Sequence, residues 1–388
     1  MPDKDGTATA ARGPLAGLRV VELAGIGPGP FAAMLLADMG ADVLRIERTD
    51  GSPSDIPPER DVTRRSRRSV AVDLRSPDGV RTLLHLAERA DVLIEGFRPG
   101  VTERLGVGPE DCWARNPRLV YGRMTGWGQD GPLAPTAGHD IGYIAVTGAL
   151  HAMGREGEAP ALPLNLVGDF GGGSLYLVIG VLAAVFEAAR SGHGQVVDAA
   201  IVDGAASMTG LFHGMMAAGL WRDERGVNML DGGVPWYDTY ETADGAWMAV
   251  GAMEPKFYAE FMTQLGLDPD EARRLNRRAW PALREEIAAA FARRTRDDWA
   301  KVFEGTNACV APVLGLTEAA AHPHLAARGT FTEVNGVTQP APAPRFSRTP
   351  SAVQSPPARP GEHTREALRE WGVRDVDALL ESGAVAQP

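Results

Sequence analysis

The stretch Leu18-Arg-Val-Val-Glu-Leu-Ala-Gly-Ile-Gly-Pro-Gly-Pro30 sets the fold class of the chain. Its first six residues predict a short buried strand, and the glycine- and proline-rich turn after them leads into a helical pattern over Phe31–Met39. Gly40 ends that helix, and a second strand is expected over Asp42–Ile46. Strand, helix and strand make a βαβ unit, which is the building block of a parallel sheet.

The same alternation of strands and helices continues along the chain. Alternating elements of this kind favour the α/β class, with a parallel, doubly wound sheet. The further elements predicted in this part are a strand over Ser69–Leu74, a helix over Asp78–Arg89, a strand over Val92–Glu95, a helix over Pro109–Asn116 and a strand over Leu119–Thr125.

Beyond Ser174 an apolar helix to about Arg190 and a helix from Val202 to about Leu220 are predicted. Tyr237–Val250 then reads as a hairpin, and a helix is expected from Pro255 to Leu265. This change of pattern predicts a second, smaller α+β domain. The expected organisation is a disordered N-terminal extension over 1–14, a large α/β domain over 15–224, a small domain over 225–325, and a return segment with C-terminal helices over 326–388 that packs on the large domain.

Charge and cysteine content narrow the function classes. The 388 residues carry a net charge of −11, which disfavours binding to nucleic acid or to an acidic membrane surface. The apolar run Leu175–Phe186 is too short to span a bilayer. Two cysteines, Cys112 and Cys309, form no disulfide framework or metal cluster and are expected to be small buried residues. We therefore expect a cytoplasmic protein that binds no nucleic acid, membrane or metal.

The spacing Gly25-x-Gly27-x-Gly29 imitates a dinucleotide-binding fingerprint but departs from it. Position 30 is proline, so the G-x-G-x-x-G pattern is broken. Pro28 and Pro30 also lack the amide hydrogens that a pyrophosphate would need at a helix start. A nicotinamide or flavin site is therefore not expected, and we expect no cofactor.

Three residues have the chemistry for moving a proton on and off carbon. His139 follows a loop rich in glycine and proline, and an imidazole can act as a general base near neutral pH. Asp169 precedes Gly171-Gly172-Gly173, where it can serve as a helix N-cap and also as a base or nucleophile beside amides that could hold an oxyanion. Glu254 lies just before a helix start, where it either serves the helix dipole or takes part in catalysis.

Arginines gather between Arg45 and Arg75 in this otherwise acidic protein. A run such as Arg64–Arg68 is usually a solvated face, but several of these arginines follow predicted strand ends, where α/β proteins bind ligands. Because arginine binds phosphate through two hydrogen bonds, the cluster predicts a small phosphate-rich ligand.

Several stretches resemble the family III CoA-transferases, and the similarity extends over about residues 15 to 350. Those that carry it are Gly17–Pro30, Leu36–Glu47, Asp91–Gly100 and Met124–Gln129, and within the family Ala137–Ile141, Leu166–Gly173 and Gly251–Pro255 are similar to its α-methylacyl-CoA racemase branch.

The resemblance implies a Rossmann-like large domain, a small domain and an interlocked homodimer. It implies that His139 and Asp169 are paired acid/base residues and that Glu254 supports His139, from the partner chain. The implied contacts to CoA fall on Arg48, Val72, Asp73, Leu74, Arg75, Gly96, Phe97, Arg98, Arg104, Gly138, Asp140, Ile141, Gly142 and Tyr143.

The activity that the resemblance implies is interconversion of (2R)- and (2S)-2-methyl-branched acyl-CoA thioesters through an enolate, without a cofactor. An alternative within the family is a CoA-transferase that uses Asp169 as nucleophile and forms an acyl anhydride. The tail Pro360–Leu368 is more similar to that transferase branch. From a different class, a non-catalytic CoA-binding protein also fits the sequence.

Overall fold

The computed structural model describes residues 13–51 and 56–388, which form two compact units. The large unit comprises Met1–Thr147, Leu164–Met208 and Ala326–Pro388 as far as they are described, and the small unit comprises Gly148–Pro163 and Thr209–Leu325. The disordered extension predicted over 1–14 lies, except for its last two residues, outside the described part of the chain.

These units differ from the predicted domain boundaries at two places. Residues 148–163 and 209–224, which we expected in the large domain, group with the small unit. The second difference follows from a break in the helix predicted over Val202–Leu220, which is divided at Thr209 into α7 (Ile201–Met208) and α8 (Gly210–Ala217). The unit boundary falls at that break.

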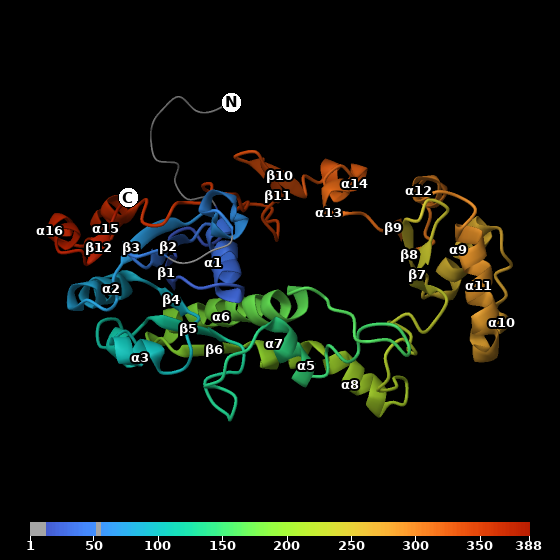
Figure 1. Cartoon of the computed structure of the whole chain (residues 1–388), viewed down its shortest axis with the longest axis horizontal. Coiled ribbons are helices and arrows are strands. Elements are labelled where there is room, and N and C mark those ends of the chain that lie inside the picture. The colour runs from blue at the N-terminus through green and yellow to red at the C-terminus, as the bar shows by residue number, and fades with distance from the viewer. Residues whose placement is uncertain (1–12, 52–55) are drawn as a thin grey trace. The chain divides into compact units, whose positions relative to one another are not determined.

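A seven-stranded, mostly parallel sheet forms the centre of the large unit, in the order β12-β3-β2-β1-β4-β5-β6 (Figure 1). Only β12 pairs antiparallel, with β3 at the sheet edge. The prediction of an α/β unit with a mostly parallel sheet is therefore confirmed. The strands are β1 (Arg19–Leu23), β2 (Asp42–Glu47), β3 (Arg68–Val72), β4 (Val92–Glu95), β5 (Val120–Thr125), β6 (Val196–Ala200) and β12 (Val385–Ala386).

Helices cover both faces of this sheet. Alternate strand residues point to opposite sides, and apolar residues on both sides need to be covered. Val20 belongs to one buried cluster, with residues of α1 (Pro28–Asp38) and α6 (Tyr176–Ser191), whereas its neighbour Val21 belongs to the other. That second cluster includes residues of α2 (Pro77–Arg89), α15 (Thr364–Glu370) and α16 (Val376–Glu381). Figure 1 shows α15 and α16 beside the β12–β3 edge.

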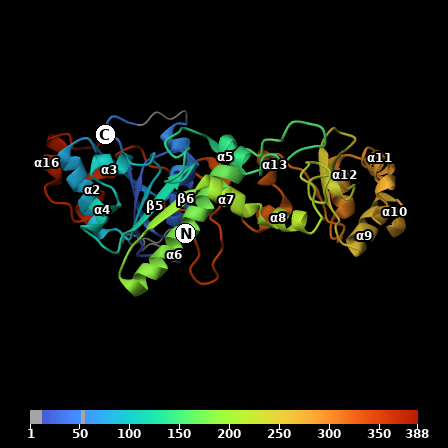
Figure 2. The same cartoon turned by 90° about the horizontal axis from the view of Figure 1, so that it is seen from below.

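The helix that carries Asp169 is longer than predicted. A π-helical segment, η3 (Leu166–Leu175), continues directly into α6, and the two make one helix of 26 residues that packs along β5 and β6 (Figure 2). By length and composition alone, this helix could cross a membrane. A single helix of this kind is weak evidence for a membrane, because core helices pass the same test, and 44% of its most apolar window is buried.

Glycines in η3 and α7 let these two helices pack in close contact. A Cβ atom on Gly204 would overlap the carbonyl oxygen of Gly172, and a Cβ on Gly172 would lie 2.7 Å from the amide nitrogen of Ala205. Gly171–Gly173 lie within the helix rather than at its start. The glycine run therefore serves helix packing, and the expectation of exposed amides there that bind an oxyanion is wrong.

Replacing Gly204 by alanine should lower the free energy of unfolding by about 1–3 kcal/mol, because the added methyl group overpacks the η3–α7 contact. Chemical denaturation at constant pH measures this loss. Gly214→Ala in α8 is the matched control, since a Cβ there meets no atom within 4 Å, and alanine favours a helix. Equal stability of the Gly204→Ala variant and the wild type would contradict the close packing.

Four arginines of the predicted phosphate-binding cluster are buried and paired with carboxylates instead. Because Arg64, Arg65 and Arg67 are buried against these partners, the prediction of a ligand contact is wrong for these three, whereas Arg45 also lines the larger cavity described below. A buried arginine needs such partners, because an unpaired charge in the interior is costly. The pairs are Arg45 and Arg67 with Glu22, Arg64 with Glu47 at 2.6 Å, and Arg65 with Asp38 at 2.7 Å.

The small unit is built on an antiparallel sheet of three strands, β7 (Tyr237–Glu241), β8 (Trp247–Gly251) and β9 (Val310–Pro312). The predicted hairpin is confirmed, and so is the predicted helix, α9 (Pro255–Leu265). Cys309 precedes β9 and is exposed, which contradicts the expected burial, whereas Cys112 is buried as expected. The other helices of this unit are α10 (Glu271–Leu275), α11 (Trp280–Phe291), α12 (Arg296–Phe303) and α13 (Leu316–Ala319).

The large unit also contains three short helices, α3 (Val101–Leu105), α4 (Pro109–Trp113) and α5 (Asp140–Val146). Leu105 of α3 and Tyr143 of α5 line the cavities described below. A hairpin of β10 (Phe331–Val334) and β11 (Val337–Pro340) follows α14 (Pro323–Ala327) and begins the return segment.

Candidate active site

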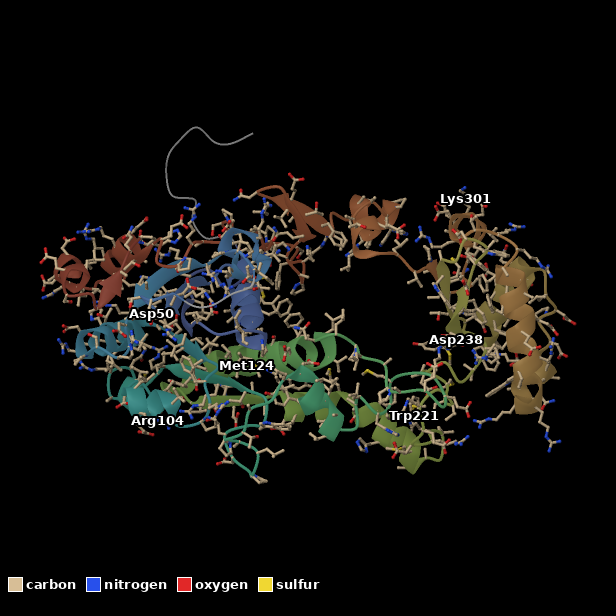
Figure 3. The ribbon with its side chains drawn as sticks, viewed as in Figure 1. Asp50, Arg104, Met124, Trp221, Asp238 and Lys301 are labelled. Atoms are coloured by element: carbon tan, nitrogen blue, oxygen red, sulfur yellow. The ribbon has the colours of Figure 1, made fainter. Side chains whose placement is uncertain are left out.

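A cavity of about 600 Å³ opens at the carboxyl ends of β1, β4 and β5. Its walls include the turn Ala24–Gly27, the start of α1 and Met124, which Figure 3 labels on β5 (Figure 3). Ligands of parallel α/β sheets bind at this edge. His139 and Asp169 both line the cavity, so the structure brings together two of the three predicted acid/base residues.

His139 is held at the rim of this cavity by the start of α5. It is the N-cap residue of that helix, and its carbonyl oxygen accepts hydrogen bonds from the amides of Gly142 and Tyr143 at 2.8 and 3.3 Å. The main chain is thereby fixed, while the residue stays exposed at the cavity. A histidine in that position can exchange a proton with a bound ligand.

Tyr143 packs under the loop that leads to His139. A Cβ atom on either Gly126 or Gly138 would collide with the Tyr143 ring, so both positions require glycine. Trp127 meets the same ring edge-to-face, with the centroids 4.8 Å apart. Gly138, predicted as a CoA contact, thus also has a packing role that sets the position of His139.

Asp169 is not the helix cap that one interpretation of the sequence proposed. The helix begins three residues earlier, at Leu166, so Asp169 lies within its first turn. Its amide donates a 2.7 Å hydrogen bond to Asp140 Oδ1, which ties the start of α5 to η3. A Cβ on Gly168 would collide with that same carboxylate, so glycine is required there. Asp140, predicted as a substrate contact, therefore connects the two acid/base residues.

Burial raises the pKa of the Asp169 carboxyl above its ordinary value. A hydrogen bond from Asn165 Nδ2 at 3.4 Å opposes this shift, the Asp140 carboxylate adds to it, and the His139 charge opposes it. Asn165 was not predicted from the sequence. Its signal was the i, i+4 spacing to Asp169, which is visible only once the helix start is known.

The turn before α1 approaches Asp169 from the other side. Gly27 has a φ angle of +68°, and a Cβ there would lie 3.2 Å from Asp169 Oδ2. Glycine adopts this backbone conformation without strain and leaves space above the carboxylate. The glycines of the false dinucleotide fingerprint therefore shape the wall of this cavity.

A second cavity of about 250 Å³ adjoins the first and shares with it Leu23, Ala24 and Phe97. Arg48 and Arg75 lie in its wall as exposed side chains, and both pair with Asp50, which Figure 3 labels, at 2.7 and 3.6 Å. Of the predicted CoA contacts, Arg48, Val72, Asp73, Leu74, Arg75 and Phe97 line this cavity, and Gly96, Phe97, Arg98, Gly138 and Tyr143 line the larger one.

The remaining predicted residues line neither cavity. Arg104 lies on α3, while Asp140, Ile141 and Gly142 form the first turn of α5. Glu254 belongs to the small unit, where it is the exposed N-cap residue of α9. The structure therefore contains one continuous group of candidate residues in the large unit and a separate glutamate in the small unit.

Residues 15–364 match CoA-transferase family III, and the chain belongs to this family. Within it, the chain is 47% identical to mouse α-methylacyl-CoA racemase over 94% of this chain and 95% of the mouse protein. The human α-methylacyl-CoA racemase is 46% identical over 96% of this chain and 98% of the human protein. A crystal structure of a CaiB/BaiF family protein from Brucella suis matches with a TM-score of 0.79 and 28% identity, covering 93% of this chain and all of that one.

Proposed function

We propose that this chain is a racemase that interconverts the (2R) and (2S) forms of 2-methyl-branched acyl-CoA thioesters. The observation that carries the proposal is the pair His139 and Asp169 in one cavity, held on neighbouring helices by the bond from the Asp169 amide to Asp140. Relatives that are 46–47% identical over nearly the full chain are named α-methylacyl-CoA racemase, which supports the same activity.

The proposed reaction exchanges one proton at the α-carbon. One of the two residues removes the proton from one face, and the electron pair moves into the thioester carbonyl to give an enolate. The other residue, in its protonated form, then adds a proton to the opposite face, and the configuration is inverted. His139 serves one face and Asp169 the other, because the two enantiomers present the α-proton on opposite sides.

Asp169 must be ionised in one direction and protonated in the other. An aspartate of ordinary pKa is a poor proton donor near neutral pH. Burial raises the pKa of Asp169, so the protonated form becomes more accessible. The carboxylic acid then donates to the enolate more readily than a solvent-exposed aspartate would.

Main-chain amides at the start of α5 are proposed to stabilise the enolate oxygen. The first amides of a helix have no acceptor within the helix. Asp140 and Ile141 do not line the cavity themselves, but their amides come directly after His139, which does. This assignment replaces the glycine run of η3, whose amides lie inside a helix. As proposed, the reaction uses only groups of this protein and the thioester, and it requires neither metal nor organic cofactor.

The CoA moiety is proposed to extend from the larger cavity into the smaller one. Arg48 and Arg75 would bind its phosphates in place of their present partners, Asp50 and Asp73. The strand order β3-β2-β1-β4-β5-β6 supports a Rossmann-like arrangement of the large unit, in which such ligands bind at the carboxyl edge of the strands.

We further propose that the working form is an interlocked homodimer in which Glu254 of the partner subunit supports His139. The outer face of the helix over 166–191 supports an interface, because Leu175, Ile179 and Phe186 are each about half or more exposed on it. A cytoplasmic location, with a role in lipid metabolism, is proposed to accompany this activity.

The alternative, CoA transfer through an aspartyl anhydride, also uses Asp169 but is not favoured. It leaves His139 without a chemical role, and the relatives with 46–47% identity carry the racemase name. Incubating the protein in D₂O with one enantiomer of a 2-methylacyl-CoA, without an acceptor acid, distinguishes the two activities. We expect gain of one deuterium and drift toward a racemic mixture. Absence of exchange would contradict the proposed racemase.

A further inference from the structure

Glu95 is a buried carboxylate in the wall of the larger cavity that the proposed proton transfers do not use. Its relative exposure is 3%. It is the last residue of β4, and its Oε2 accepts a 2.6 Å hydrogen bond from the amide of Phe97. Phe97 lines both cavities, so this bond fixes the turn Gly96–Arg98 at the place where they join.

Arg123 ties Glu95 to two further segments. The two residues are paired in the β4–β5 ladder, and Arg123 Nε lies 3.6 Å from Glu95 Oε1. The other guanidinium nitrogens donate to Gln129 at 2.6 Å and to Glu103. Within the described residues, Arg123 Nε is buried without a hydrogen bond, so its attraction to Glu95 is electrostatic.

These contacts join the parts of the chain that surround the proposed ligand. Glu103 lies on α3 beside Arg104, which Figure 3 labels, and Gln129 lies in the loop that leads to His139. The segment from Glu95 to α3 is therefore fixed at its start by the Phe97 amide and at its end by Arg123. The residues between these points, Gly96 to Arg98, include predicted CoA contacts.

We propose that Glu95 is a positioning residue: through the Phe97 amide and Arg123 it holds the turn Gly96–Arg98 in the shape that binds CoA. This inference rests on the acyl-CoA function proposed above. It adds to that function a carboxylate that increases the affinity for CoA but does not act on the α-carbon.

The charge of Glu95 makes this positioning dependent on pH. Burial raises the pKa of Glu95 to about 7, against the opposing effects of the Phe97 amide and the Arg123 guanidinium. The carboxylates of Glu103 and Asp198 add to the rise, and the Tyr121 side chain on β5 also interacts with Glu95. Above pH 7 the ionised carboxylate attracts Arg123 and is a strong acceptor for the amide, whereas below pH 7 both interactions weaken.

Titration calorimetry with free CoA tests the proposal, since binding is measured without turnover. At pH 8 we expect Glu95→Ala to bind CoA about tenfold more weakly than wild type, and Glu95→Gln to bind it about three- to tenfold more weakly. At pH 6 the wild type should approach Glu95→Gln, because both side chains are then neutral. The ratio of the CoA affinities of wild type and Glu95→Gln is taken at each pH. The titration of the CoA phosphates, and of the groups that both proteins share, affects both affinities equally and leaves this ratio unchanged.

The matched control is Glu88→Ala, which removes a carboxylate from the outer surface of α2 and should leave CoA binding unchanged. If Glu95→Ala does not fold, as circular dichroism would show, the comparison of wild type with Glu95→Gln carries the test. Unchanged CoA affinity in Glu95→Ala, or a ratio of wild type to Glu95→Gln that is the same at pH 6 and 8, would overturn the positioning role alone. Absence of CoA binding by the wild type would instead overturn the proposed function, and this inference with it.

Discussion

Replacing Asp169 by asparagine should lower the rate of racemisation by about 10³-fold, in both directions. The amide of asparagine has the shape of the carboxyl group but neither accepts nor returns a proton. Both directions are lost because each needs Asp169 once, as base in one and as acid in the other. Following the optical activity of a 2-methylacyl-CoA, starting from each enantiomer separately, measures the two rates.

The same substitution should leave the fold intact and make it more stable at high pH. A carboxyl group whose folded-state pKa is raised contributes stability that is fully present below its unfolded pKa and is lost as pH rises through the folded pKa. Asparagine does not titrate, so the free energy of unfolding of the variant, relative to that of the wild type, increases as the pH rises from acid toward neutral. Thermal melting at a series of pH values checks this gain.

Asp203→Asn is the matched control, because it changes an exposed aspartate of α7 in the same way. It should leave both rates unchanged. Racemisation by Asp169→Asn at more than a tenth of the wild-type rate would contradict a role for Asp169 in proton transfer. Loss of stability with rising pH, relative to wild type, would contradict the burial of the carboxyl group as the cause of its raised pKa.

The sheet could be predicted because its signals are local. Each βαβ repeat carries its own apolar strand, turn and helix pattern, and the predicted strand over Val92–Glu95 agrees with β4 at both ends. The predicted start of α1, at Phe31, is three residues too late, because the prediction assigns Pro28 and Pro30 to the preceding turn. Proline is well tolerated in the first turn of a helix, and α1 begins at Pro28.

The candidate site was harder to predict, because its chemistry depends on contacts between distant segments. Sequence placed Asp169 before a glycine run, which is ambiguous between a cap and a ligand-binding turn. Only the structure shows that the helix begins at Leu166, so that the run lies inside it, and that Gly172 packs against Gly204. The roles of Asp140 and Glu95 likewise depend on hydrogen bonds to the amides of Asp169 and Phe97, which no spacing rule predicts.

The arginine cluster is a second feature whose role could not be predicted from the sequence. Arginines that follow a strand look the same in the sequence whether they bind phosphate or pair with buried carboxylates. Arg67 is almost fully buried and paired with Glu22, whereas Arg48 is exposed in the wall of the smaller cavity. Burial separates the two roles, and burial is a property of the tertiary structure.

Replacing His139 by alanine should abolish racemisation but leave one half of the reaction. In the variant, Asp169 can still remove the α-proton from the enantiomer that presents it on the aspartate face, and it can return a deuteron from D₂O to that same face. We therefore expect deuterium exchange with retained configuration for one enantiomer and neither exchange nor inversion for the other. Mass spectrometry combined with chiral analysis, on each enantiomer separately, measures both events.

This pattern distinguishes two-base proton transfer from the other candidate activities. A transferase that uses Asp169 as nucleophile would retain activity toward an acceptor acid without His139, and a CoA-binding protein without catalysis would show no exchange even as wild type. His193→Ala, which removes an exposed histidine outside the cavity, should behave like wild type. Full racemisation by His139→Ala would require another residue to reach the second face, and the assignment of His139 would then be wrong.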